Sequence, residues 1–254
     1  MYYILDRPLL VFVLSLMMLW LSETIMAFFF RRRRKLEEKS EDFGIILAAA
    51  LTLLGLIIGF TFSMAVNRYD QRKNYEEAEA NAIGTEYVRA DLLPAADAAK
   101  VRTLLVEYLD QRVLFYTTRD HQQLAQINAS TAKLQAELWS AVSDPAAAQQ
   151  TAVVALAVSG INDVLNSQGY TQAAWWNRIP IAAWSLMVVI AICCNVLIGY
   201  GARDANAQPL LLLALPLLVS ISFSLIADID SPHSGFIRVN PQNIISLSES
   251  LHAH

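Results

Sequence analysis

The stretch that decides the fold reads FGIILAAALTLLGLIIGFTFSMAV at residues 43–66 and continues as NRYDQRKNYEEAEANAI up to Gly84. Its first part carries no charged residue and is longer than the run of about 20 apolar residues that a helix needs to cross a bilayer. Its second part is strongly charged and contains neither glycine nor proline before Gly84, the residues that most often end helices. We therefore predict one long helix that leaves the membrane and carries events there into a water-exposed region.

The composition of the whole chain is that of a membrane protein. Of its 254 residues, 55% are hydrophobic and 17% are charged, and the mean hydropathy is +0.38. These values exclude a disordered protein and argue against an ordinary soluble domain, so the lipid bilayer is the first partner that we expect. The formal net charge of -4 at pH 7 gives no overall basic signal, which argues against nucleic acid as a partner.

Three further apolar runs predict membrane helices, at residues 8–30, 179–201 and 209–227. The first is followed by a basic cluster from Arg31 to Lys35. Because a signal peptide carries its basic residues before the apolar core, this order favours a membrane helix with a basic anchor. With residues 43–66, these runs predict four membrane crossings.

The segment between the second and third crossings has apolar residues at helical spacing and no strand-like alternation, which predicts a helical bundle in water. Pro94 should break its first helix, Asp144-Pro145 should start its last helix, and Gly169 can end it. The predicted fold class is therefore all-α: a multipass membrane protein with four transmembrane helices and a helical insert. The predicted parts are an N-terminal membrane hairpin (1–66), the insert (67–178), a C-terminal membrane hairpin (179–228) and a tail (229–254).

The insert begins with an acidic segment that contains Glu76, Glu77, Glu79 and Glu86. Basic residues are interspersed with these glutamates, so we interpret the segment as a solvated helix face with internal ion pairs rather than as a cation site.

Signatures of enzymes are absent from the sequence. It contains no glycine-rich phosphate loop, no His-Glu-x-x-His motif and no nucleophile elbow. The two cysteines, Cys193 and Cys194, are adjacent in an apolar run and are typical of small buried residues. We therefore expect no catalytic residue, no metal and no cofactor.

Two segments carry a resemblance to a known family. The first is GFTFSMAVNRYDQRKNYEEAE at residues 59–79, followed by ANAIGT and by RADLLP, which ends at Pro94; the second is LIADIDSPHSG at residues 225–235, followed by IRV. They resemble a bacterial membrane family described as bestrophin-like. Gly59-Phe60 and Arg68-Tyr69 are similar to the second helix of bestrophins, and Asp228 to Gly235 is similar to the acidic segment after their last membrane helix.

The resemblance implies a homopentameric ion channel, mostly anion-conducting, with its central pore lined by the second helix. Small inorganic ions are then a further partner. Calcium gating is not carried over, because His233 and Ser234 stand where animal bestrophins continue their acidic run. The resemblance also implies that both chain ends and the insert face the cytoplasm, whereas the basic residues from Arg31 to Lys39 place them outside by the positive-inside rule. We follow the charge rule for the orientation.

One face of the second helix is the predicted pore lining. Its residues recur at helical spacing along one stripe, and the resemblance selects this stripe because Phe60 matches the aromatic residue of a bestrophin neck. The alternative is that Leu56 and Phe60 pack against lipid or another helix. The predicted pore-lining residues are Thr52, Leu56, Phe60, Ser63 and Asn67.

Four charged residues are predicted at the pore mouth or in a structural ion pair: Arg68, Arg72, Asp228 and Asp230. Two roles stay open for the aspartates: an ion pair with Arg68 or Arg72, and the handling of ions. The predicted function is a bestrophin-like, anion-conducting channel of the bacterial inner membrane. The alternative is a membrane-anchored sensor or scaffold whose insert binds a partner.

Overall fold

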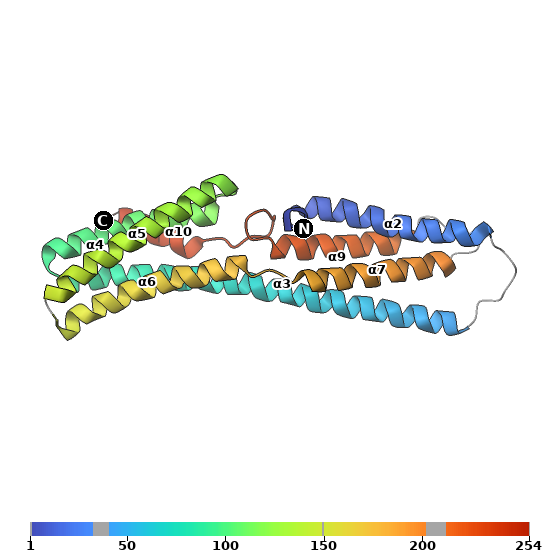
Figure 1. Ribbon diagram of the computed structural model, residues 1–254, viewed down its shortest axis with the longest axis horizontal. Helices are drawn as coiled ribbons and strands as arrows, with labels where there is room; N and C mark the ends of the chain where they lie inside the picture. Colours follow the sequence, from blue (N-terminus) through green and yellow to red (C-terminus); the bar gives the residue numbers. More distant parts are fainter. Residues whose placement is uncertain (1, 33–40, 149, 202–211, 254) are drawn as a thin grey trace. The chain divides into compact units, whose positions relative to one another are not determined.

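The computed structural model describes residues 2–32, 41–148, 150–201 and 212–253. The described residues are almost entirely helical and contain no strand, which confirms the all-α fold. The helices, labelled in Figure 1, are α1 (Tyr2–Leu5), α2 (Pro8–Arg32), α3 (Glu41–Arg89), the 3-10 helix η1 (Ala90–Leu92), α4 (Ala95–Thr117), α5 (His121–Ala148), α6 (Ala152–Trp176), α7 (Ile181–Gly201), α9 (Ala214–Asp230) and α10 (Gln242–His252).

The described chain forms two compact units. Unit 1 consists of Met1–Asn67 and Arg178–Ile237, and unit 2 of Arg68–Asn177 and Arg238–His254. Helix α3 belongs to both, because it runs from Glu41 to Arg89 without a break. The prediction of one long helix is confirmed.

Unit 1 is built on α2, which packs against α7 and α9. Helix α7 approaches α2 closely at Gly199, where a Cβ atom would lie 3.0 Å from the backbone carbon of Glu23. Only glycine permits this approach. Three helical segments are long and apolar enough to cross a membrane: Pro8–Phe29, Asp42–Leu92 and Ala152–Gly201.

The fourth predicted crossing falls partly outside the described residues. Residues 209–211 are not described, and α9 begins at Ala214 and ends at Asp230. The count of four crossings stays a prediction.

Unit 2 is a helical bundle with an apolar core from α3, α4, α5, α6 and α10. One predicted helix start is wrong here. Pro145 lies inside α5, and α6 starts at Ala152, where the side chain of Thr151 accepts a hydrogen bond from Val154 N at 3.2 Å. Thr151 therefore supplies the N-cap that the sequence pattern assigned to Asp144. Fully buried core residues include Ile83, Leu105, Leu109, Leu138, Ile161 and Ile244.

Two further differences concern the end of α6 and the C-terminal segment. Helix α6 continues past Gly169 to Trp176. In the segment that we treated as a tail, α10 forms and contacts α4. Its buried Ile244 joins the core of unit 2, and this burial explains why the short helix is stable.

Candidate functional site

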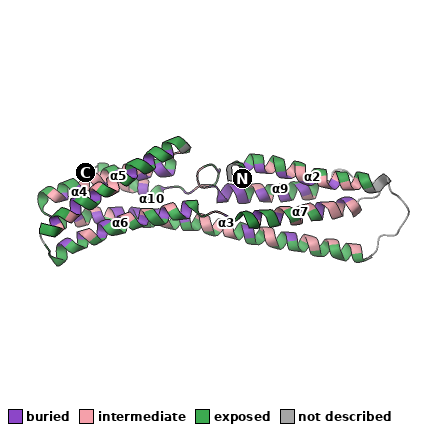
Figure 2. Ribbon diagram, in the orientation of Figure 1, coloured by how far each residue is buried: buried purple, intermediate pink, exposed green. Residues whose placement is uncertain are grey.

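The predicted pore-lining stripe lies on an open face of α3. All five of its residues are exposed in the single chain, with Leu56 at 52% and Phe60 at 61% of full exposure. The opposite face of the same helix is buried through Leu54, Thr61 and Ala65. Figure 2 shows how much of this part of α3 is exposed. The membrane half of α3 is thus covered along a narrow line only, and the rest of its surface, which includes the stripe, is open to a pore, a second subunit or lipid.

The chemistry of the stripe changes along the helix. Thr52 Oγ1 donates its proton to Ala48 O at 2.8 Å, so this hydroxyl is already engaged within the helix. Leu56 and Phe60, about one turn apart, add an apolar section. Ser63 and Asn67 follow as exposed polar side chains. The stripe therefore has an apolar section followed by a polar section.

Arg68 and Arg72 both contact the C-terminal end of α6. Arg72 is 1% exposed, and its Nε donates to Ala174 O and its Nη2 to Asn177 O, both at 3.3 Å. Arg68 Nη2 donates to Asn177 Oδ1 at 3.4 Å. A helix ends with carbonyl groups that lack partners and with partial negative charge, so Arg72 caps α6 and fixes it to α3.

Asp228 and Asp230 both lie in the last turn of α9 and accept hydrogen bonds from backbone outside this helix. Asp228 accepts hydrogen bonds from Phe236 N at 2.7 Å and Ile237 N at 2.8 Å. Asp230 accepts from Ile179 N at 3.1 Å and lies 3.7 Å from the Arg178 Nε. These contacts give both carboxylates a structural role in unit 1. The pairing with Arg68 or Arg72 would join the two units and stays a prediction.

The interpretation of the acidic segment as a solvated face is wrong for three of its four glutamates. Glu76, Glu79 and Glu86 are all 0% exposed, and of the four only Glu77 faces water. The signal that could have revealed this is a regular spacing of four and three residues, which marks one buried side of a packed helix. The buried row consists of Arg72, Glu76, Glu79, Ile83, Glu86 and Ala90.

Glu79 is the centre of a buried polar network. Arg112 Nε and Nη2 of α4 both donate to its carboxylate. Tyr116 Oη donates to Glu79 Oε2 at 2.9 Å, and Thr171 Oγ1 of α6 donates to the same oxygen at 3.0 Å. The network satisfies the carboxylate and joins three helices.

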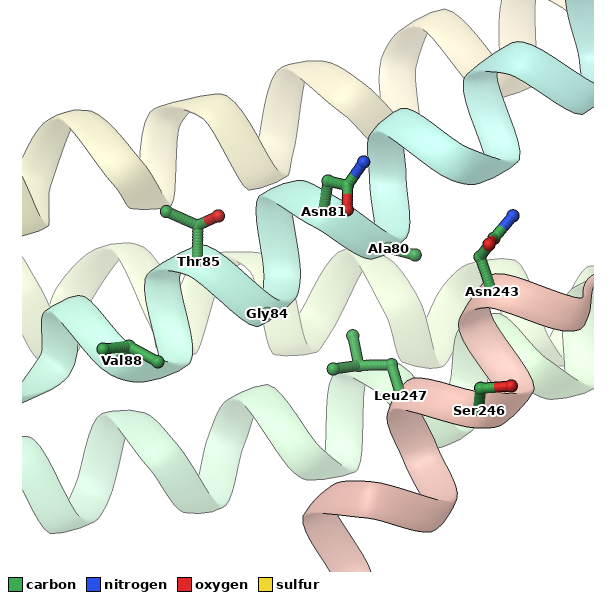
Figure 3. Close-up of a pocket in the computed structure, with 8 residues that line it drawn as sticks. All are labelled: Ala80, Asn81, Gly84, Thr85, Val88, Asn243, Ser246 and Leu247. Carbon is green, nitrogen blue, oxygen red and sulfur yellow. The ribbon is translucent and has the colours of Figure 1, made fainter.

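A groove lies between α3 and α10 in unit 2 (Figure 3). It has a volume of about 450 Å³. Uncharged side chains line it, and Leu247 approaches α3 at Gly84. Among the described residues, no group of three or more His, Cys, Asp or Glu side chains is placed to hold a metal. The groove itself offers no charged group to bind an ion.

Comparison with known proteins places the chain in a family. A family model described as "Bestrophin-like domain" matches residues 10–244. The chain belongs to the bestrophin-like family. This confirms the resemblance carried by residues 59–79 and 225–235.

Solved structures of bacterial bestrophin homologues have the same fold. One from Klebsiella pneumoniae is 13% identical over 97% of this chain and 98% of that chain, with a TM-score of 0.67. A tryptophan-to-alanine variant of a Klebsiella pneumoniae homologue is 12% identical over 97% of both chains, with a TM-score of 0.70. No curated protein matches the chain. The bestrophin-like protein described here therefore shares the fold of these homologues over nearly its whole length.

Proposed function

We propose that this bestrophin-like protein is a homopentameric, anion-conducting channel of the bacterial inner membrane. Its pore is lined by the α3 stripe of Thr52, Leu56, Phe60, Ser63 and Asn67. The observation that carries the proposal is the exposure of the whole stripe on a helix whose opposite face is buried. Copies of α3 around an axis would cover the open faces and enclose a path between them.

The membrane arrangement that we propose has four crossings per chain, with the insert outside the bilayer. The crossings are residues 8–30, 43–66, 179–201 and 209–227. Trp176, at the end of α6, is 75% exposed and suits the lipid–water boundary just before the third crossing. Oligomerisation follows from the open face of α3, because one chain of this size does not enclose a pore by itself.

The anion preference that we propose rests on charge at the end of the stripe. Arg68 directly follows Asn67, whereas Asp228 and Asp230 are engaged by backbone N–H groups. A guanidinium at a pore mouth raises the local concentration of anions. Arg68 is therefore the residue that we assign to anion attraction.

Purified protein in planar bilayers with asymmetric chloride salt tests the function. An anion channel should give a reversal potential near the chloride equilibrium potential, and Arg68→Gln should move it toward zero. Lys73→Gln is the matched control, because Lys73 is an exposed cation on the same helix. A reversal potential near the cation equilibrium potential would overturn the anion preference.

The same preparation tests the alternative of a sensor or scaffold. That alternative predicts no current from protein that is assembled and correctly folded. Mass measurement in mild detergents should show an oligomer, and a strictly monomeric mass would remove the channel proposal.

A further inference from the structure

Glu86 is a buried carboxyl group whose oxygens have no hydrogen-bond partner. The side chain is 0% exposed, and neither Oε1 nor Oε2 is within hydrogen-bond reach of a described donor. This differs from Glu79, seven residues earlier on α3, which accepts hydrogen bonds from three side chains. An ionised carboxylate without partners is very costly to bury, whereas a neutral carboxyl costs far less.

Gly160 of α6 makes the space that Glu86 occupies. A Cβ atom at position 160 would overlap Glu86 Oε2 and would lie 2.6 Å from its Cδ. Any larger residue would therefore displace the carboxyl group. We call this packing of Glu86 against Gly160 the Glu86–Gly160 contact. It brings α3 and α6 together with a titratable group between them.

Two charged side chains stand at the edge of this contact. Arg89 Nη1 would be 3.1 Å from a Cβ at position 160, and it lies 3.9 Å from Asp163 Oδ2. Both side chains are partly exposed, at 37% and 60%. They form a solvated pair beside the buried carboxyl, so an ionised Glu86 has a cation within reach once it leaves the contact.

The neighbouring helices direct their own titratable groups elsewhere. Three of those of α4 surround Glu79, that of η1 forms an ion pair with a fourth, and the histidine of α10 contacts a fifth. The groups concerned are Tyr108, Arg112 and Tyr116 of α4 around Glu79, Asp91 of η1 with Arg102, and His252 of α10 with Asp110.

We propose that the Glu86–Gly160 contact is a proton-sensitive latch between α3 and α6. A neutral Glu86 fills the space at Gly160 and holds the two helices together. On ionisation the carboxylate moves out toward Arg89 and water, and the space that it leaves loosens α6. The bound ligand is the proton, because the carboxyl group itself fills the space that a larger ion would need.

The direction of the pH effect follows from the environment of Glu86. Burial raises its pKa from 4.5 to about 8; Arg89 opposes the rise and Asp163 adds to it. In an opened state the carboxyl is solvated and has a more ordinary pKa. Opening therefore becomes more favourable as pH rises between these two values, by up to about tenfold per pH unit. Above the pKa of the closed state, both states are ionised and the effect levels off.

Hydrogen–deuterium exchange of the full chain in detergent tests the latch without requiring ion conduction. Peptides within residues 152–168 report on α6, and comparison with Glu86→Gln at each pH cancels the intrinsic exchange rate. The ratio of wild-type to Glu86→Gln exchange should rise at least about tenfold from pH 5 to pH 8. Glu77→Gln is the matched control and should behave as wild type, because Glu77 is exposed on the same helix.

A second variant covers the case in which Glu86→Gln does not assemble. Gly160→Ala fills the space with a methyl group and places the carboxyl in water, so the ratio of wild-type to Gly160→Ala exchange, taken at each pH, should also rise from pH 5 to pH 8. A wild-type to Glu86→Gln ratio that is independent of pH would overturn the proposal. So would a ratio of wild-type to Gly160→Ala exchange that is independent of pH.

Discussion

At the scale of single residues, the most consequential feature is the ion pair of Glu79 and Arg112. Both side chains are 0% exposed. A buried pair costs desolvation energy, so its presence is weak evidence of net stabilisation. Removing one partner is strongly destabilising, because the remaining charge then has neither water nor a counter-ion.

Glu79→Ala should therefore destabilise unit 2 by about 3–5 kcal/mol, because it leaves the Arg112 guanidinium buried and unpaired. Thermal unfolding of the purified protein in detergent, followed by circular dichroism, measures the effect. The matched control is Glu77→Ala, at an exposed position on the same helix. Equal melting temperatures for the two variants would show that the network does not stabilise unit 2.

The sequence predicted these residues only in part. The acidic and basic residues around Glu79 suggested a solvated face, because charged residues are usually exposed. Their spacing of four and three residues indicates burial instead, because it places them on the same side of the helix as Ile83 and Ala90, which are buried. The identity of a partner such as Arg112 depends on how α4 packs, and that contact is not visible in a single sequence.

At the scale of elements, α10 is held to α3 by another buried glutamate. Glu76 Oε1 accepts a hydrogen bond from Ile244 N at 2.9 Å, and Glu76 Oε2 accepts one from Asn243 Nδ2 at 2.7 Å. Ile244 N lies in the first turn of α10, where backbone N–H groups lack partners within the helix. Glu76 thus caps α10 from a different helix.

We expect Glu76→Ala to release α10, because these N–H groups would lose their acceptor and the helix is only 11 residues long. Limited proteolysis should then cut within residues 238–253 at least about tenfold faster than in wild type, as a loss of about 1.4 kcal/mol in local stability implies. Glu77→Ala should be cut at the wild-type rate. Unchanged cutting of the Glu76→Ala chain would show that apolar contacts alone hold α10.

It was easier to predict which segments form helices than to predict where each helix begins and ends. An apolar run, followed by a charged stretch without glycine or proline before Gly84, predicted α3, because the length of this helix follows from local sequence. Asp144-Pro145 resembled a helix start, yet α5 continues through it with Ala141 and Val142 buried on the core side. Tertiary packing there outweighs the local preference of proline. Helix α10 was missed because its stability comes from unit 2 rather than from its own sequence.

At the scale of the whole molecule, orientation is the feature on which charge and family disagree. The positive-inside rule places the loop from Arg31 to Lys39 in the cytoplasm and the insert outside, whereas the bestrophin analogy reverses both. Gln123 is an exposed residue of α5 and a suitable reporter.

With the insert outside, a cysteine at Gln123 should be labelled by a membrane-impermeant thiol reagent on intact cells. The chain without this substitution is the control for Cys193 and Cys194. Neutral replacements of Arg31 to Arg34 should give mixed labelling, because the basic anchor sets the orientation. Labelling of the new cysteine only after lysis would place the insert in the cytoplasm.

The fold of the whole molecule was predictable from the two family segments, and the pore was not. Residues 59–79 and 225–235 carry the resemblance that the family model extends to residues 10–244. A stripe at helical spacing, however, looks the same in sequence whether it faces a pore, a second subunit or lipid. Exposure of Leu56 and Phe60 in the single chain fits all three surroundings and leaves the pore as a proposal.

Unitary conductance of Leu56→Ala with Phe60→Ala in planar bilayers tests the channel proposal most directly. A ring of large apolar side chains can stop ions by excluding water, so shrinking it should raise the conductance well above that of wild type while the oligomer stays assembled. The matched control is Phe62→Ala, at an exposed position off the stripe, which should conduct as wild type. An assembled double variant that is silent, or whose conductance equals that of wild type, would contradict the assignment of the pore to this face of α3.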